Sequence, residues 1–363
     1  QKLKSMKETL ERLSEITAPV CVTLILNTHR TTPENQKDII ALKNLISETY
    51  ERLQREHGTD IAKRYTAKLQ GLAEDIDHYH NDHGLMLFVN DEIAEYLRLP
   101  IHVTDRVIID KTFATRSIVR AMKRVSDYYV LVLSKGKARL IEASGDVVVK
   151  EVRGEGFPFN DSQFMKLSSA ESSNAARASN LAHEFFNRVD KALNKIRNEN
   201  PLPVVVCAEE SNYHLYLAAA DHPNIILGHV LLKNIDASPN SIVKDYVAPQ
   251  VEEMTLLKHR ERISELSAAV NSGRALTDLN EIWAAVRVGR GKTIFVEQGY
   301  IQAVRKEDGL LKPIALDEVD SKEDINDVVD EMIEHTMKMG GDVVFVRKGD
   351  LEQFNKLALA TRY

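Results

Sequence analysis

The stretch of sequence that decides the fold is YYVLVLSKGKARLIEA, at residues 128–143. Large apolar residues alternate along its first half, a Ser-Lys-Gly turn follows, and the chain returns through a second apolar run, which predicts a β-hairpin. Farther along, PVVVCAEE at residues 203–210 predicts a buried strand, and a long helix separates it from the hairpin. Strand, helix and strand in succession predict an α/β fold for this part of the chain.

A Ser-rich segment, SSAESSNAARASN at residues 168–180, leads into that helix. It contains no apolar residue larger than Ala, so we expect it to lie outside the core. Within it, Ser168 and Glu171 have the spacing of a capping box, and a helix start explains them better than chemistry does. The helix places its apolar residues on one face: Leu181, Phe185, Val189, Leu193 and Ile196. A polar loop on a rigid helix is able to reach a partner.

The length of 363 residues exceeds one comfortable core, because roughly 100–200 residues make a domain. We expect three α/β domains with mixed sheets, at residues 1–125, 126–247 and 248–363. The second boundary precedes a charged helix that we expect to end at Gly273, since glycine is the usual C-terminal cap. The formal net charge of -6 argues against a chain coated with basic residues, so nucleic-acid contact must be regional.

Two cysteines, Cys21 and Cys207, each lie inside an apolar run, so we expect two buried thiols and neither a disulfide framework nor a cysteine metal site. No run approaches the ~18 apolar residues of a membrane span, and the N-terminal segment is a charged helix. These features predict a soluble, cytoplasmic protein without a membrane partner.

The segment GRGKT, at residues 289–293, ends like a phosphate-binding P-loop. The first glycine of such a loop falls at Val286 here. The segment also lies between a predicted helix and a predicted strand, which reverses the P-loop order of strand, loop and helix. We therefore expect no nucleotide site at this segment and no cofactor in the protein.

The segment DHYHNDH, at residues 77–83, gathers three His and two Asp. Imidazole and carboxylate groups bind zinc and other divalent metals, but this spacing matches no standard site. A solvated turn between a helix and a strand explains it equally well, and we expect no metal. Asp77, His80 and Asp82 stay the compact alternative for a metal-dependent nuclease.

Thr28, His29 and Arg30 follow a predicted strand and precede a predicted helix, in which Lys43 adds a further cation. An imidazole and guanidinium at such a turn are able to contact RNA phosphates or bases. A capped turn is the structural alternative for the same three residues.

Together these segments resemble the bacterial branch of the archaeal and eukaryotic class 1 release factors, the superfamily that includes Pelota and the ribosome hibernation factor Balon. The segments that carry the resemblance are VTLILNTHRTTPENQKDIIALKNLI, GLMLFVN, YLRLP, YYVLVLSKGKARLIEA, KTIFVEQ, DVVFV and LALATRY. The resemblance implies a tRNA-shaped, three-domain protein that enters the ribosomal A site. It also implies a C-terminal αβα domain like the kink-turn-binding ribosomal proteins. That domain would contact a translational GTPase such as elongation factor Tu.

The sequence departs from the superfamily at one decisive point, because it has no Gly-Gly-Gln triplet. Release factors carry that triplet on the loop before the long helix of the middle domain, where it serves peptide release. The matching loop offers Ser169, Glu171, Asn174 and Arg177, and the helix adds Lys191 and Lys195, whose charges suit contact with RNA phosphate.

The sequence therefore predicts a non-catalytic factor that binds ribosomal RNA, with P-site tRNA as a further candidate partner and no DNA. It would occupy idle or stalled ribosomes, in hibernation or rescue. The enzymatic alternative is a peptidyl-tRNA hydrolase in which the Ser-rich loop positions water, through Glu171 or Asn174. An acidic stretch at residues 307–327 suits protein contact by the third domain better than RNA contact.

Overall fold

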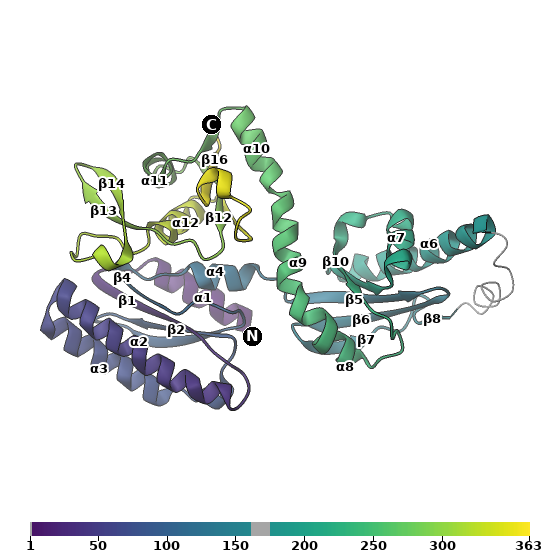
Figure 1. The fold of residues 1–363 in the computed structure, drawn as a ribbon, viewed down its shortest axis with the longest axis horizontal. Coiled ribbons are helices and arrows are strands. Elements are labelled where there is room, and N and C mark those ends of the chain that lie inside the picture. Colours follow the sequence, from purple (N-terminus) through teal and green to yellow (C-terminus); the bar gives the residue numbers. More distant parts are fainter. Residues whose placement is uncertain (1, 161–174) are drawn as a thin grey trace. The chain divides into compact units, whose positions relative to one another are not determined.

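The computed structural model describes residues 2–160 and 175–363, and the chain divides into two compact units. Unit 1 joins Gln1–Lys123 with His259–Tyr363, and unit 2 is Arg124–Lys258. Figure 1 shows that both units combine helices with sheets, which confirms the predicted α/β class. The division into three domains stays a prediction.

The first sheet of unit 1 is antiparallel, with strand order β3-β2-β1-β4. Its strands are β1 (Thr17–Asn27), β2 (Gly84–Val89), β3 (Ala94–Leu99) and β4 (Arg106–Thr112). Side chains alternate across a sheet, so one face packs against helices α2 (Glu34–His57) and α3 (Thr59–Asp75). The other face packs against α1 (Lys2–Ser14) and α4 (Arg116–Lys123). The expectation of a mixed sheet was wrong for this part of the chain.

The second sheet of unit 1 is mixed, with strand order β11-β16-β12-β15. Its strands are β11 (Ala275–Leu276), β12 (Gly291–Glu297), β15 (Asp342–Val346) and β16 (Leu357–Thr361). Helices α11 (Leu279–Arg287) and α12 (Val328–Lys338) pack on one face and α10 (Ile263–Asn271) on the other. A separate hairpin joins β13 (Ala303–Glu307) to β14 (Leu310–Ile314).

Two local predictions concern this second sheet. Helix α10 ends two residues before Gly273, which adopts a φ of +69°, as expected for a glycine that closes a helix. Residues 289–290 follow helix α11 and residues 291–293 begin strand β12, so the Gly-Lys-Thr segment has helix-to-strand order and does not form a P-loop.

Unit 2 contains a mixed sheet of order β10-β9-β5-β6-β7, with β8 also paired to β6. Its strands are β5 (Asp127–Ser134), β6 (Lys137–Ser144), β7 (Val147–Glu151), β8 (Phe159–Asn160), β9 (Val204–Ala208) and β10 (Ile226–Leu231). Strands β5 and β6 form the predicted hairpin, and Gly136 in its turn has a φ of +79°. One face packs against α6 (Ala175–Glu199) and α7 (Glu210–Ala219).

The predicted apolar face of α6 is confirmed, because Phe185, Val189 and Leu193 are buried against this sheet. The opposite face packs against α8 (Pro239–Ser241), the π-helix Ile242–Val247 and the start of α9 (Ala248–Glu261). Both cysteines are free and buried, and burial raises the pKa of the Cys21 thiol to about 11 and that of Cys207 to about 12.

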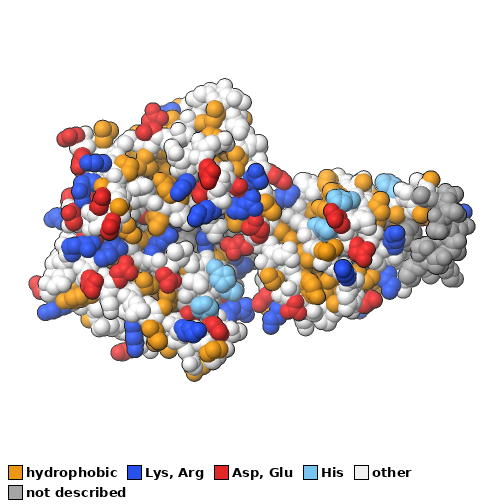
Figure 2. Space-filling model, viewed as in Figure 1, with side chains coloured by type: hydrophobic (Ala, Val, Ile, Leu, Met, Phe, Trp, Pro, Cys, Tyr) orange, Lys and Arg blue, Asp and Glu red, His pale blue; other side chains and the backbone are white. Residues whose placement is uncertain are grey.

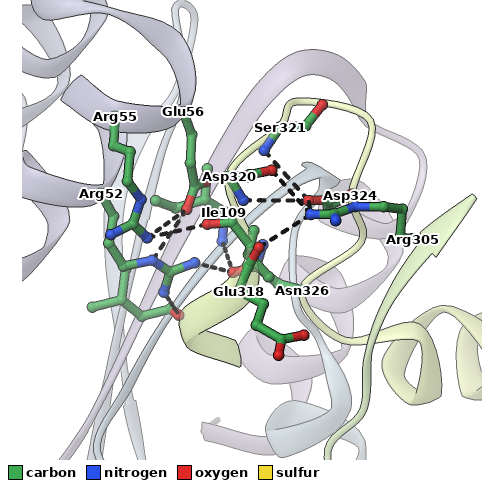
Figure 3. Close-up of polar contacts among 12 residues, drawn as sticks. Arg52, Arg55, Glu56, Ile109, Arg305, Glu318, Asp320, Ser321, Asp324 and Asn326 are labelled. Atoms are coloured by element: carbon green, nitrogen blue, oxygen red, sulfur yellow. Dashed lines mark hydrogen bonds and ion pairs between the residues drawn. The ribbon is translucent and has the colours of Figure 1, made fainter. Parts of the chain in front are cut away.

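A buried polar seam joins the first and last segments of unit 1 (Figure 3). Arg52 of helix α2 donates to the Val107 carbonyl at 2.6 Å and to the side-chain carbonyl of Asn326. Its Nε lies 3.4 Å from Glu56, and burial raises the pKa of that carboxyl. Asn326 in turn accepts the Ile109 backbone N–H at 3.3 Å, so one guanidinium ties a helix, a strand and the distant 326 segment together.

Arg52→Met is expected to lower the free energy of unfolding of the full chain by about 3 kcal/mol, because Asn326 loses its charged donor while it stays buried, and buried Glu56 keeps only Arg55 as a cationic partner. Denaturant unfolding measures this loss. Arg64→Met is the control, since its pair with Asp91 is exposed and contributes about 0–1 kcal/mol. A loss below that of the control would show that the seam does not stabilise unit 1.

Candidate nucleic-acid interface

The loop after strand β1 carries the first predicted contact residues. Thr28 is fully buried: its hydroxyl donates to the Asp82 carbonyl at 2.6 Å, and its backbone N–H donates to the His83 carbonyl at 3.0 Å. Thr28 therefore holds two loops together and faces no ligand, which corrects its predicted role. Arg30 is exposed two residues later.

His29 is held in place by the buried carboxylate of Asp38. One Asp38 oxygen accepts the His29 backbone N–H at 2.8 Å, and the other lies 2.8 Å from His29 Nδ1. Asn81 also donates its side-chain amide to Asp38, at 2.9 Å. Because a carboxylate only accepts hydrogen bonds, Nδ1 carries a proton and Nε2 is the ring atom available for outside contacts. The His29 side chain is 44 % exposed.

A short 3₁₀ turn, His78–His80, lies in the segment that the sequence singled out as rich in His and Asp. Asp77 accepts the Tyr79 backbone N–H at 3.0 Å and lies 2.7 Å from His80 Nδ1. The hydrogen bond from His80, followed by that from Tyr79, lowers the pKa of the Asp77 carboxyl. Tyr79 is 68 % exposed, and its ring offers a flat apolar surface.

The metal alternative gains no support from this segment. The Asp82 carboxylate accepts the His83 backbone N–H at 3.0 Å, whereas the Asp77 carboxylate contacts His80. Within residues 2–160 and 175–363, no group of three or more His, Cys, Asp or Glu side chains is arranged to hold a metal ion.

A fifth histidine, which the sequence did not single out, completes this edge of the first sheet. The His102 ring centroid lies 4.5 Å from that of His83, and His102 Nδ1 lies 3.2 Å from the Asn27 side-chain oxygen. Strand β1 ends at Asn27 and β2 begins at Gly84, so the loops meet at one end of the sheet. We call this edge the histidine rim: His29, His78, His80, His83 and His102.

Figure 2 shows histidine side chains gathered on the visible faces of both units. The predicted cation Lys43 is exposed on helix α2, nine residues beyond the helix start at Glu34. At 1.5 Å per residue, that spacing places it about 14 Å along the helix axis from its start. The predicted pair of Arg30 and Lys43 is therefore spread along a surface and is not one cluster.

In unit 2, the predicted cations lie on helix α6. Arg177, Lys191 and Lys195 are all exposed, and Lys195 lies 3.3 Å from the Glu155 carboxylate. Arg188 also stacks its guanidinium on Phe185, 5.7 Å from the ring centroid. The helix therefore presents positive charge along its exposed face. Ser168, Ser169, Glu171 and Asn174, which the sequence placed on the preceding loop, lie outside the described residues.

Helix α6 is anchored by a buried carboxylate that sequence reasoning missed. Asp190 is fully buried and accepts hydrogen bonds from the Tyr216 hydroxyl at 2.8 Å, the Asp221 backbone N–H at 2.9 Å and the Asn194 amide at 3.2 Å. Burial and the Asp190 charge raise the pKa of Tyr216. These bonds join α6 to α7 and to the turn after it, and so fix the helix that follows the Ser-rich loop.

Asp190→Ala is expected to lower the free energy of unfolding by about 2–4 kcal/mol, because three donors lose their acceptor inside the core. Denaturant titration followed by circular dichroism measures the change. The matched control is Glu184→Ala on the same helix, where the side chain is exposed and the change should stay within about 0.5 kcal/mol. Equal effects of the two substitutions would contradict the anchoring role.

Comparison with known proteins gives one family match, and it includes helix α6 but not the histidine rim. Residues 127–290 match the family model of bacterial archaeo-eukaryotic release factor family 3. The matched stretch is therefore similar to this release-factor family, and it is less than half of the 363-residue chain. The matched stretch begins at the hairpin of unit 2, includes helix α6 and ends just before strand β12. No curated protein sequence matches the chain.

Several solved structures resemble this chain at low identity. Pelota from Archaeoglobus fulgidus is 15% identical, covers 74% of this chain and 76% of its own, and gives a TM-score of 0.38. Dom34 from S. cerevisiae, a translation termination-like factor, is 13% identical, with coverage of 77% and 79% and a TM-score of 0.36. An archaeal translation termination factor is 15% identical, with coverage of 100% and 99% and a TM-score of 0.27.

No helix among the described residues is long and apolar enough to cross a membrane.

Proposed function

We propose that this release-factor-like protein binds the ribosome and occupies the A site of idle or stalled ribosomes, in hibernation or rescue, without cleaving peptidyl-tRNA. The proposal that the protein does not cleave peptidyl-tRNA rests on one observation. The sequence has no Gly-Gly-Gln triplet, although its middle segment matches a release-factor family. The one Gly-Gly pair in the sequence, Gly340-Gly341, is followed by Asp342 and precedes strand β15.

Two surfaces support RNA contact. The histidine rim offers donors and exposed rings next to Arg30, and helix α6 offers Arg177, Lys191 and Lys195. Cations that neutralise phosphates release counterions, so binding through them weakens as salt rises. Exposed aromatic and imidazole rings suit the stacking by which proteins recognise unpaired RNA bases.

The partners that we propose are ribosomal RNA, P-site tRNA and a translational GTPase such as elongation factor Tu. Among the similar structures, Dom34 is described as interacting with Hbs1, and an archaeal Pelota is described as ribosome-bound with ABCE1. Those descriptions concern the relatives, and they motivate a search for equivalent partners of this chain.

Arg30→Glu is expected to weaken ribosome binding several-fold and to reduce the slope of log affinity against log salt by about 1, because one phosphate contact is lost. Cosedimentation with purified ribosomes at several salt concentrations measures both quantities. The matched control is Lys63→Glu, an equal charge reversal on the exposed surface of α3 near its start at Thr59, away from the rim. Failure of the unaltered protein to cosediment at low salt would refute the proposal.

Ribosomes that carry labelled peptidyl-tRNA are expected to keep their peptide when the protein binds. Filter binding of the released peptide over time gives the rate, with a Gly-Gly-Gln release factor as the positive control. Steady release that disappears in Ser169→Ala, Glu171→Gln and Asn174→Ala variants would instead favour the hydrolase. Cryo-electron microscopy of the same complexes then tests whether the density occupies the A site.

A further inference from the structure

A small cavity lies within unit 1, where strand β4 and helix α4 meet the segments around residues 298 and 327–330. Its volume is about 40 Å³. A buried water needs about 10–15 Å³ by this measure, so the space suits about three waters or one small oxyanion. The charged side chains that line it are Arg106, Arg116, Arg120, Asp327 and Asp330.

The two carboxylates in this lining are already engaged. Asp327 contacts the Arg116 guanidinium, which also donates to the Tyr300 carbonyl. Asp330 accepts the backbone N–H groups of Thr115 at 2.9 Å and Arg116 at 2.7 Å, at the start of helix α4. Burial raises the pKa of Asp330.

Arg106 also lines the cavity, but neither Asp327 nor Asp330 forms a hydrogen bond or ion pair with it. It begins strand β4, in register with Ile25 of β1, and its side chain lines the cavity. Among the described residues, its guanidinium forms no hydrogen bond or ion pair. Burial, and then the positive charge of Arg116, lowers the pKa of Arg106, which means that the protein holds this charge at a cost.

We propose that this cavity binds a small oxyanion, a phosphate group, which Arg106 would hold together with the Ser117 hydroxyl and Arg120. A guanidinium donates two parallel hydrogen bonds to phosphate oxygens. The lining comes from both chain segments of unit 1, so the anion would stabilise that unit by binding the folded state alone.

Thermal unfolding of the full chain with inorganic phosphate tests this site, with chloride at equal ionic strength as the control. We expect a saturable rise in Tm with phosphate and none with chloride. Arg106→Gln should weaken phosphate binding roughly tenfold or more, and Arg106→Lys should restore part of it. Arg64→Gln, a substitution on the exposed surface of α3, should leave binding unchanged.

The Tm of Arg106→Gln in the absence of phosphate distinguishes an anion-binding role of Arg106 from a purely structural one. Because Arg106→Gln removes a buried charge that forms no hydrogen bond or ion pair, we expect it to raise Tm in chloride, whereas loss of a structural arginine would lower it. Absence of a phosphate-specific shift, or equal shifts in Arg106→Gln and the unaltered protein, would overturn the proposal.

The same assay identifies the source of the phosphate group. Two further ligands, adenosine 5′-monophosphate and adenosine, are compared with inorganic phosphate. If adenosine 5′-monophosphate binds at least as tightly as inorganic phosphate and adenosine does not bind, the natural ligand is a phosphomonoester such as a nucleotide or an RNA end. Binding of inorganic phosphate alone indicates the free ion. Either result supports the site, and neither depends on ribosome binding, so failure here and failure of the proposed function are separate outcomes.

Discussion

The contacts of Arg52 are the constraint on which the architecture of unit 1 depends. Its guanidinium joins helix α2 to strand β4 and to Asn326, a residue 274 positions away in the sequence. Removing one partner from such a network leaves the others buried and unsatisfied, so the contact favours a single arrangement of the two segments. Residues 124–258 lie between those segments in sequence and form a separate unit with its own core.

Both candidate RNA surfaces have the same design, in which a buried carboxylate fixes an element that carries exposed donors. Asp38 orients His29 at the end of the first sheet, and Asp190 anchors helix α6. A ligand then meets side chains whose positions are already restricted, which lowers the entropy lost on binding. In the histidine rim this restriction also sets the tautomer of His29, and with it the ring nitrogen that faces outward.

The sequence predicted those features that depend on local periodicity. The hairpin at residues 128–143, the apolar face of α6 and the helix end before Gly273 all follow from side-chain alternation, helical spacing or the conformation of glycine. The order of helix and strand around GRGKT also sufficed to exclude a P-loop.

What the sequence could not predict depends on partners that are distant along the chain. Asp190 sits beside Val189 in an ordinary helical pattern, and nothing nearby indicates that Tyr216 and Asp221 will use its oxygens. Thr28 looked available because it follows a strand, yet the carbonyls that bury it come from residues 82 and 83. The pairing of His83 with His102 likewise exists only because strands β2 and β3 place their loops together.

The charges buried within unit 1 favour specificity over stability. Asp110, Asp327, Asp330 and Glu331 are all carboxyls whose pKa burial raises, and Arg106 is a guanidinium whose pKa burial lowers. Well-packed apolar residues would be at least as stable in such positions. An apolar contact would, however, tolerate sliding, whereas hydrogen bonds such as those from Thr115 and Arg116 to Asp330 accept one register only. We infer that these hydrogen bonds fix the position of residues 259–363 against strand β4 and helix α4. The cavity beside Arg106 is then the space that remains between these rigidly packed elements.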